Sequence, residues 1–308
     1  MTTPRTFWEL SDFGLIRRFL QSGRKYSGPS SNLFHVGDLT WQGRMYTRDT
    51  FKPEERIALW ERADGELDGF AWYYPKSSEV VFQIDPRLKR SLAWQEIAES
   101  MLIWSLERNR NEPVSTALTI PEFASDSEFA EFIIGRGFDS GDSPVMRFHY
   151  QELTGNVPPP VLPEGFVIRP IDPESEAEIE QRVAIHREVW HPSRFTVEGY
   201  RQLRASEGYD PELDLVAVAP DGTFASYAIC WPDDVNFCGE FEPVGTREAF
   251  RRKGLSRAVL YEGMRRLESR GYTGAYVNSF EDNPASCALY LAAGFPVVDR
   301  GIPYQQLP

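Results

Sequence analysis

The chain of 308 residues is long enough for two ordinary domains, and its hydrophobic share of 41% excludes wholesale disorder. Its 46 acidic and 33 basic residues give a net charge of −13. Nucleic acid and anionic membrane surfaces bind basic patches, so this balance argues against both, and we expect neither as a partner.

The N-terminal segment MTTPRTFWELSDFG lacks the apolar core of a signal peptide, and no run in the chain approaches the roughly eighteen apolar residues of a membrane span. The cysteines are odd in number and lack the spacing of metal ligands; they are Cys230, Cys238 and Cys287. We therefore expect no disulfide framework, no metal site and a reducing, cytoplasmic location.

A proline-rich segment near the midpoint predicts a linker. Residues 151–166, QELTGNVPPPVLPEGF, contain four prolines and two glycines, which favour an extended connection over a helix or strand. We accordingly place a first domain at residues 1–155, a linker at 156–164 and a second domain at 165–308.

The two halves also resemble each other. Residues 63–75 align with residues 220–232 at an offset of 157, which places Asp64-Gly65 on Asp221-Gly222. The same offset places Gly137-Phe138 on Gly294-Phe295. A register shared over this distance indicates a tandem duplication.

The second half predicts an alternation of strands and helices. In chain order we expect a strand at 165–171, a helix at 173–190, two strands at 213–231 about an Asp-Gly turn, a strand at 238–246, a helix at 255–270 and a strand at 274–280. Asn283-Pro284 predicts the start of a further helix, and a last strand follows Gly294. The expected fold is an α/β domain with a mixed sheet.

The strongest local feature is a basic turn before the helix at 255–270. Five cations surround Gly254, namely Arg247, Arg251, Arg252, Lys253 and Arg257. A helix N-terminus has free amide groups and a positive dipole end, so this turn predicts a site for a ligand with several phosphates. The pattern fits neither the P-loop nor the dinucleotide fingerprint. The alternative is an exposed, charged helix start without a ligand.

Two motifs together resemble a known family. R-x-x-G-x-S at Arg251–Ser256, followed by a helix and then NPASCALYLAAGF from Asn283, is similar to the GNAT superfamily of acetyl-CoA-dependent N-acetyltransferases. The resemblance covers residues 165–308, with Ser256 in place of the usual Gly or Ala. The tandem plan is similar to that of the mycothiol synthase group. This similarity of plan does not imply that the substrate is the same.

The resemblance implies that acetyl-CoA is the cofactor, used as a co-substrate. It assigns the phosphate contacts to Arg251, Arg252, Lys253, Gly254, Leu255 and Ser256. It assigns the pantetheine arm to the main chain of Val244, Gly245 and Thr246, with further contacts from Asn283 and Ser286.

Acetyl transfer to an amine needs a base for the ammonium and an acid for the leaving thiolate. Glu240 and Glu242 are two residues apart on one strand, so their side chains face the same way, and either is a candidate base. By resemblance, the Tyr290 hydroxyl is the acid. The alternatives are solvent-facing glutamates and a half-buried helix tyrosine.

The other candidates are weaker. Trp190 and Arg194 lie in the segment that resembles the acceptor wall of the superfamily. We interpret His186 and His191 as packing or surface residues and Cys287 as a helix-core residue rather than a nucleophile.

The first half is expected to be a degenerate copy without the cofactor loop. In our alignment Leu92 replaces Gly254, Trp94 replaces Ser256 and fills the phosphate space, and Ile133 replaces Tyr290. We expect most tryptophans of this half, which include Trp8 and Trp41, to lie in the core and a few to line a cleft between the domains.

The sequence therefore predicts two tandem GNAT-like domains, of which the second transfers an acetyl group to a primary amine of a small molecule. The alternative is a non-catalytic acyl-CoA binding or sensing module. The acceptor, the length of the acyl group and the oligomeric state are left open.

Overall fold

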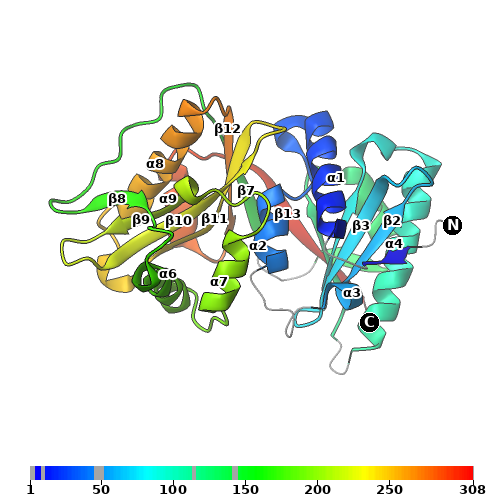
Figure 1. Ribbon diagram of the computed structural model, residues 1–308. Helices are drawn as coiled ribbons and strands as arrows, with labels where there is room; N and C mark the ends of the chain where they lie inside the picture. The colour runs from blue at the N-terminus through cyan, green and yellow to red at the C-terminus, as the bar shows by residue number, and fades with distance from the viewer. Residues whose placement is uncertain (1–3, 8–10, 45–51, 113–115, 141–144, 308) are drawn as a thin grey trace.

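The computed structural model describes residues 4–7, 11–44, 52–112, 116–140 and 145–307 (Figure 1). Its first half contains β1 (Arg5–Thr6), α1 (Ser11–Ser27), α2 (Val36–Arg44), α3 (Pro53–Arg56), β2 (Ile57–Glu61), β3 (Leu67–Tyr74), β4 (Glu79–Ile84), α4 (Leu92–Arg110), β5 (Thr119–Phe123), α5 (Ser127–Ile134), β6 (Phe138–Ser140) and β7 (Met146–Glu152).

The second half contains β8 (Val167–Pro170), α6 (Glu176–Val189), α7 (Val197–Arg204), β9 (Asp214–Val218), β10 (Phe224–Asp233), β11 (Cys238–Thr246), α8 (Leu255–Ser269), β12 (Gly274–Phe280), α9 (Pro284–Ala292) and β13 (Val297–Gln306). The expected strands at 238–246 and 274–280 are confirmed to the residue. The Asn283 side chain caps α9, with Pro284 in the first helical position, as predicted. Helix α7 is an addition that the sequence did not indicate.

The described strands form one mixed sheet that runs through both halves, in the order β1-β2-β3-β4-β5-β13-β7-β12-β11-β10-β9-β8, with β6 beside β13. The two halves exchange strands at the centre of this sheet. β7 of the first half pairs with β12, and β13 of the second half pairs with β5, β6 and β7. In Figure 1 the red β13 accordingly crosses from the second half into the first. The predicted boundary at residues 156–164 therefore separates the halves in sequence but not in the sheet.

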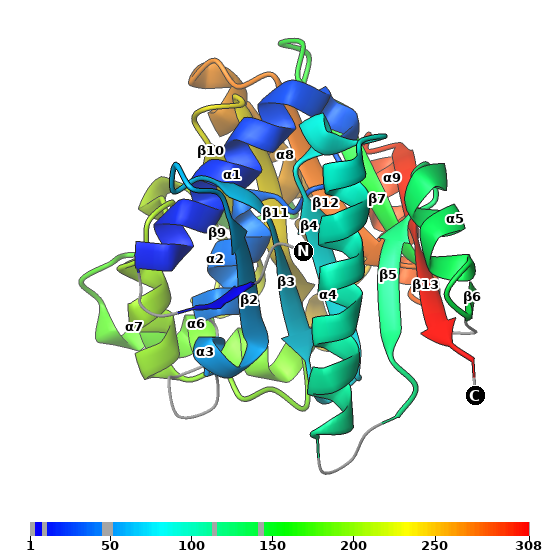
Figure 2. The same ribbon diagram turned by 90° about the vertical axis from the view of Figure 1, so that its right-hand side faces the viewer.

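Helices cover both faces of the sheet. In the second half, α8 packs on Leu215, Ala217 and Ala228, while α6 and α7 pack on the alternate residues Val216 and Val218. The first half repeats the plan: α4 and α5 cover one face, and α1 covers the other. Helix α2 packs beside α1 and docks on β10 and β11 of the second half. Figure 2 shows α4 lying across β3 and β4. These layers confirm the expected α/β fold class.

The structure shows why the first half lacks the basic turn. Ser91, whose side chain accepts a hydrogen bond from the Trp94 amide, is the N-cap of α4, and Gly254 is the N-cap of α8. The 3-10 turns Pro86–Leu88 and Glu248–Phe250, and the positive-φ residues Arg90 and Arg252, keep the offset of 162 that places Leu92 on Gly254. In this register α4 begins one residue earlier than α8. Trp94 does not fill a phosphate space; it is buried against Phe129 and Phe132 in the core.

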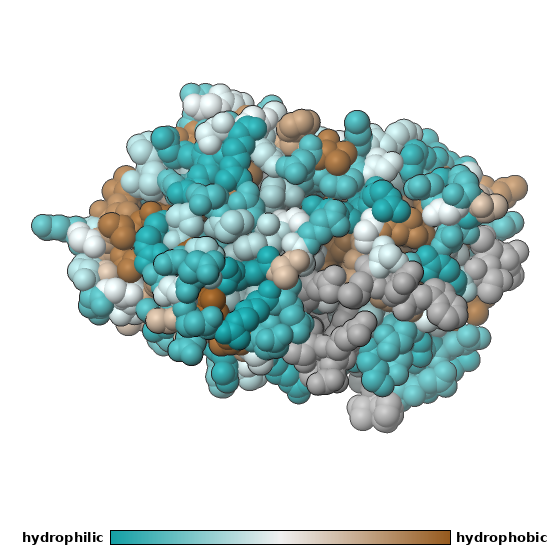
Figure 3. Space-filling model, viewed as in Figure 1, coloured by the Kyte–Doolittle hydropathy of each residue, from teal (hydrophilic) through white to brown (hydrophobic). Residues whose placement is uncertain are grey.

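Most of the described surface in Figure 3 is hydrophilic, as expected from the charge. Within the described ranges, no helix is long and apolar enough to cross a membrane. All three cysteines are buried and free. Of the tryptophans in the first half, Trp60, Trp72 and Trp94 are buried in the core of that half, while Trp8 lies outside the described residues.

Candidate active site

A cleft of about 1700 Å³ lies between the two halves. This exceeds the 300–1,000 Å³ of an ordinary small-molecule pocket, so the cleft has room for two ligands together. Its wall from the second half is made by β11, the start of α8, the end of β12 and α9. Its wall from the first half is made by α2, β3, β4 and β5.

The basic turn opens into this cleft. Gly254 has φ +78°, a left-handed conformation that disfavours side chains, and a Cβ placed there would meet no atom within 4 Å. The space in front of its Cα is therefore open. The amides of the first turn of α8 lack intrahelical partners, because the first helical hydrogen bond runs from Ala258 N to the Gly254 carbonyl. These features fit a phosphate group.

The cations of the turn are not equivalent. Arg251, Arg252 and Arg257 are exposed and line the cleft. Lys253 does not line it; its Nζ lies 5.2 Å from the centre of the Phe250 ring. Arg247 lies with Nη1 3.4 Å from a carboxylate oxygen of Glu188. Three of the predicted arginines therefore remain available to phosphates.

The end of β11 offers main-chain groups to the cleft. β11 pairs with β12 only from Cys238 to Glu240, and the two strands then diverge. Val244, Gly245 and Thr246 pair with β10 on one side and line the cleft on the other. Such a free strand edge suits an extended amide chain like that of pantetheine. Leu255, the first residue of α8, is buried and also lines the cleft.

Three small polar residues complete this end of the cleft. The hydroxyl of Ser256 is hydrogen-bonded to Thr246 Oγ1, which ties the start of α8 to the end of β11. Asn283 and Ser286 also line the cleft, but they cap α9: Asn283 Oδ1 accepts from the Ser286 amide at 3.2 Å, and the Ser286 hydroxyl donates to the Asn283 carbonyl at 3.0 Å.

The two candidate bases lie in a cluster of three carboxyl groups. Glu240 and Glu242 share one face of β11, as predicted, and carboxylate oxygens of both lie within 4.8 Å of one from Asp38 on α2. Glu240 is 2% exposed and accepts hydrogen bonds from the Asp38 amide and from Asn278 Nδ2, both at 3.1 Å. Glu242 and Asp38 line the cleft.

Burial and mutual repulsion make this cluster retain protons. Burial raises the pKa of Glu240 to about 7, although Arg24 and the two N–H donors oppose the shift. Burial and the nearby Glu240 charge raise the pKa of Asp38 to about 7. Burial and both neighbouring carboxyl groups raise the pKa of Glu242 well above its usual value. One carboxyl of the cluster is thus poised to exchange a proton near neutral pH.

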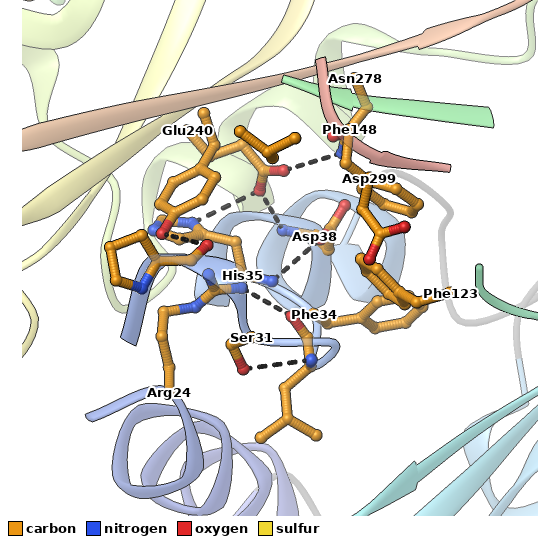
Figure 4. Close-up of a pocket in the computed structure, with 14 residues that line it drawn as sticks. Arg24, Ser31, Phe34, His35, Asp38, Phe123, Phe148, Glu240, Asn278 and Asp299 are labelled. Atoms are coloured by element: carbon orange, nitrogen blue, oxygen red, sulfur yellow. Dashed lines mark hydrogen bonds and ion pairs between the residues drawn. The ribbon is translucent and has the colours of Figure 1, made fainter. Parts of the chain in front are cut away.

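Sequence reasoning missed Asp38 because it lies in the half that we interpreted as structural. Figure 4 shows Asp38, Glu240 and Asn278 meeting across the boundary between the halves, beside His35. Gly37 is the sequence signal for this approach: a Cβ there would lie 2.7 Å from Glu240 Oε2 and 2.8 Å from Trp231. Only glycine lets α2 come so close to β10 and β11.

A second group of metal-capable side chains lies behind the cluster, formed by His35, Asp233 and Cys238. Asp233 already accepts hydrogen bonds from Gln21, Val235 and Asn236. Burial raises the pKa of the Cys238 thiol to about 12 and lowers that of His35 to about 3. A protonated thiol and a saturated carboxylate are poor ligands, so this group reads as interface packing.

Tyr290 lines the cleft from α9 and is 6% exposed. Burial, and next the charge of Glu242, raise the pKa of its hydroxyl above the usual value. The hydroxyl therefore stays protonated at every physiological pH and is able to donate a proton or a hydrogen bond.

The remaining wall is aromatic. Trp190 and Arg194, the candidates for the acceptor wall, line the cleft, and Trp190 Nε1 donates to the Tyr227 hydroxyl at 2.9 Å. His186 is a buried packing residue that also lines the cleft. The centre of its ring lies 5.4 Å from the ring centre of Trp41, a residue of α2 that lines the cleft as well. Trp41 is thus a tryptophan of the first half that lines the cleft, as we expected of a few, and the sequence did not identify which one.

Comparison with known proteins agrees with this geometry. The acetyltransferase (GNAT) family model matches residues 179–295. A mycothiol acetyltransferase of Kineococcus radiotolerans is 30% identical over 152 residues, 48% of each chain, and one of Actinosynnema mirum is 29% identical over 154 residues, 49% of this chain and 50% of that one. The matched region thus spans about half the length of these curated relatives.

Solved structures match over nearly the whole chain. A GCN5-related N-acetyltransferase from Sphaerobacter thermophilus covers 98% of this chain and 94% of its own, with a TM-score of 0.64 and 20% identity. A tandem GNAT protein from the clavulanic acid biosynthesis pathway covers 99% and 98%, with a TM-score of 0.65 and 16% identity. At these identities the likeness shows the fold alone. The chain therefore has the fold of tandem GNAT proteins, and residues 179–295 in its second half match the acetyltransferase (GNAT) family model.

Proposed function

We propose that this protein transfers an acetyl group from acetyl-CoA to a primary amine of a small molecule, by direct attack while both are bound in the cleft. The observation that carries the proposal is the opening of the Gly254 turn into the same cleft as Glu242 and Tyr290. The part of the cleft at the Gly254 turn suits phosphates, and the part at the cluster of carboxyl groups suits an ammonium group.

The cofactor would be held by the open turn at Gly254, by Arg251, Arg252 and Arg257, and by the free edge of β11 at Val244–Thr246. When bound it supplies an activated acetyl thioester. Ser256 and Thr246 fix the turn against the strand, so the phosphate site and the pantetheine site keep their relative positions.

Glu242 is the proposed base, because it lines the cleft whereas Glu240 lies behind it with N–H donors on both carboxylate oxygens. The cluster shares its protons, and in the form in which Glu242 is ionised this carboxylate takes the proton that the ammonium must lose before it attacks. Tyr290 is the proposed acid, because its hydroxyl remains protonated and lies in the same wall. It gives its proton to the departing thiolate.

The acceptor would lie between the carboxyl cluster and the aromatic wall of Trp41 and Trp190. An ammonium group there gains from the carboxylates and from the ring faces. Because the curated relatives are mycothiol acetyltransferases, a mycothiol-related amine is the first acceptor to assay.

The cofactor site is tested by the thermal shift with acetyl-CoA on the wild type, Gly254→Ala and Gly271→Ala. Both glycines have positive φ (+78° and +86°), and a Cβ at either would meet nothing within 4 Å. They lie at opposite ends of α8, so both variants carry a similar backbone strain of about 1 kcal/mol. Only Gly254→Ala places a methyl group in the proposed phosphate site.

When acetyl-CoA is present at a hundredfold excess over its dissociation constant, we expect the free energy of unfolding of the wild type and of Gly271→Ala to rise by about 2.7 kcal/mol. That of Gly254→Ala should rise much less. No shift in the wild type would overturn the cofactor site. A shift without CoA release in any amine screen would instead favour the non-catalytic binding module.

A further inference from the structure

Three polar side chains form a hydrogen-bonded chain where β11 and β12 diverge. His149 on β7 has Nε2 2.9 Å from the Ser279 hydroxyl on β12 and Nδ1 3.0 Å from the Phe295 carbonyl. Cys287 on α9 has its sulfur 3.3 Å from the same hydroxyl. His149 is fully buried, whereas Ser279 belongs to the wall of the cleft. The catalytic roles proposed above use none of these groups.

The direction of each hydrogen bond follows from the partners. The Phe295 carbonyl only accepts, so His149 Nδ1 carries a hydrogen. Burial lowers the pKa of His149, so the ring is neutral at physiological pH and its Nε2 is bare. The Ser279 hydroxyl must therefore donate to Nε2. This is the arrangement of a nucleophile, its base and a group that orients the base.

The cleft places this pair next to the reacting groups. Ser279 shares the wall with Tyr290, whose ring centre lies 5.6 Å from that of His149. If Tyr290 protonates the CoA sulfur, the thioester carbon lies on the same side of the cleft as the Ser279 oxygen, so the inference rests on the proposed function. Cys287 does not line the cleft, and its sulfur bonds Ser279 and the Phe280 carbonyl at 3.4 Å rather than a histidine.

We propose that Ser279, activated by His149, accepts the acyl group of acyl-CoA when no amine is bound, and that the protein thereby also hydrolyses acyl-CoA. The Ser279 oxygen forms a bond to the thioester carbon, its proton passes to His149 Nε2, and the carbon–sulfur bond breaks. CoA leaves as the thiol with the proton of Tyr290, which His149 restores. Water, deprotonated by His149, then cleaves the serine ester, and His149 returns this proton to the Ser279 oxygen. The acyl group leaves as the carboxylate, with one proton released to solvent.

The test is incubation of the full chain with acetyl-CoA in the absence of amine. Free thiol release and the intact mass are followed together, and acetyl-CoA binding is measured separately by thermal shift. The variants are Ser279→Ala, His149→Gln and, as a matched control, Ser269→Ala, whose hydroxyl is exposed at the end of α8 and donates to the Arg266 carbonyl. Peptide fragmentation distinguishes an acetyl group on Ser279 from one on Cys287, which hydroxylamine removes as a thioester.

We expect slow thiol release by the wild type and Ser269→Ala, background release by Ser279→Ala, and release lowered about 10²-fold or more by His149→Gln. Unchanged release in Ser279→Ala, no release by a wild type that binds acetyl-CoA, or acetylation at Cys287 would each overturn the inference. If the wild type fails to bind acetyl-CoA, the proposed function falls first, and this outcome is recognised by the absent thermal shift. Because Ser279→Ala removes only a hydroxyl, it remains informative if His149→Gln does not fold.

Discussion

Asp38 of the first half and Glu242 of the second half bring carboxylate oxygens within 4.8 Å of each other at the wall of the cleft. Asp38 comes from α2, whose backbone approaches β11 closely only because residue 37 is glycine. The half without the basic turn therefore supplies part of the site in which the proposed base would act.

This relationship predicts a pH dependence of stability. The pKa of Asp38 is about 3.8 unfolded and about 7 in the fold, so between these values the folded state binds more protons than the unfolded state. The Asp38 contribution to the free energy of unfolding is therefore fully present below about pH 4 and is lost as the pH rises through 7. As the pH rises from 5 to 8, the free energy of unfolding of Asp38→Asn should therefore increase by roughly 1–3 kcal/mol relative to that of the wild type.

The comparison with the wild type is necessary because His35 and His186, whose pKa values burial lowers to about 3, contribute the opposite trend. Asp221→Asn is a control that should show no pH dependence between pH 5 and 8, since hydrogen bonds from Thr223 lower the pKa of Asp221 from its usual 3.8 and it stays ionised throughout this range. Thermal unfolding of the three proteins across this pH range decides the matter. A pH-independent difference for Asp38→Asn would show that Asp38 does not titrate in this window.

The two glutamates should respond differently to substitution. Glu242→Gln should lower kcat about 10²-fold or more without changing acetyl-CoA binding, because it removes the proposed base, which lines the cleft. Glu240→Gln should lower the thermal stability and affect kcat less, because Glu240 serves as an acceptor for Asp38 and Asn278. Steady-state kinetics and melting temperatures of both variants provide the comparison. A larger loss of kcat in Glu240→Gln at unchanged stability would assign the base to Glu240.

Tyr290→Phe isolates the proposed acid. The change removes one hydroxyl from a buried ring, so we expect nearly normal folding and a normal thermal shift with acetyl-CoA. The value of kcat should fall by about 10²-fold or more, because the thiolate must then take its proton from water. CoA release with a saturating amine measures this. A kcat within twofold of the wild type would mean that another group protonates the thiolate.

The local features of the second half were readable from the sequence because glycine, proline and asparagine mark its boundaries. Asn283-Pro284 gave the start of α9, and the basic turn gave the start of α8 with its left-handed Gly254. Glu240 and Glu242 share a face because successive side chains of a strand point to opposite faces of the sheet. These are properties of short segments, which local rules describe.

The partners of segments far apart in the sequence were not readable in this way. A last strand after Gly294 was expected, but the neighbours of β13, and the place of β7 beside it, depend on the packing of the whole sheet. Asp38 and Trp41 were missed for the same reason: they are three residues apart on a short helix, and only the docking of α2 on β10 and β11 gives them a role. The close approach at Gly37 is visible only once Glu240 and Trp231 are placed.

The strand exchange predicts that neither half folds alone. Residues 165–308 without the first half would leave β12 and β13 without β7 between them, and the other half would lose β13 from between β5 and β7. A chain cut within residues 158–160, in the extended linker, should instead keep all of these pairings. We expect the two co-expressed fragments to copurify as a complex that binds acetyl-CoA, and each fragment expressed alone to be largely unfolded.

Size-exclusion chromatography and circular dichroism of the fragments, separately and mixed, test this. A cut within residues 220–222, in the turn between β9 and β10, is the matched control, because it also severs a surface connection. It leaves β7 and β13 in separate fragments, as the linker cut does, but it joins β8 and β9 to the first half. A folded, monomeric 165–308 fragment that binds acetyl-CoA would contradict the prediction, since it would show that the second half completes its own sheet without β7. The carboxyl cluster would then also have to function without Asp38, and the first half would lose its proposed part in the site.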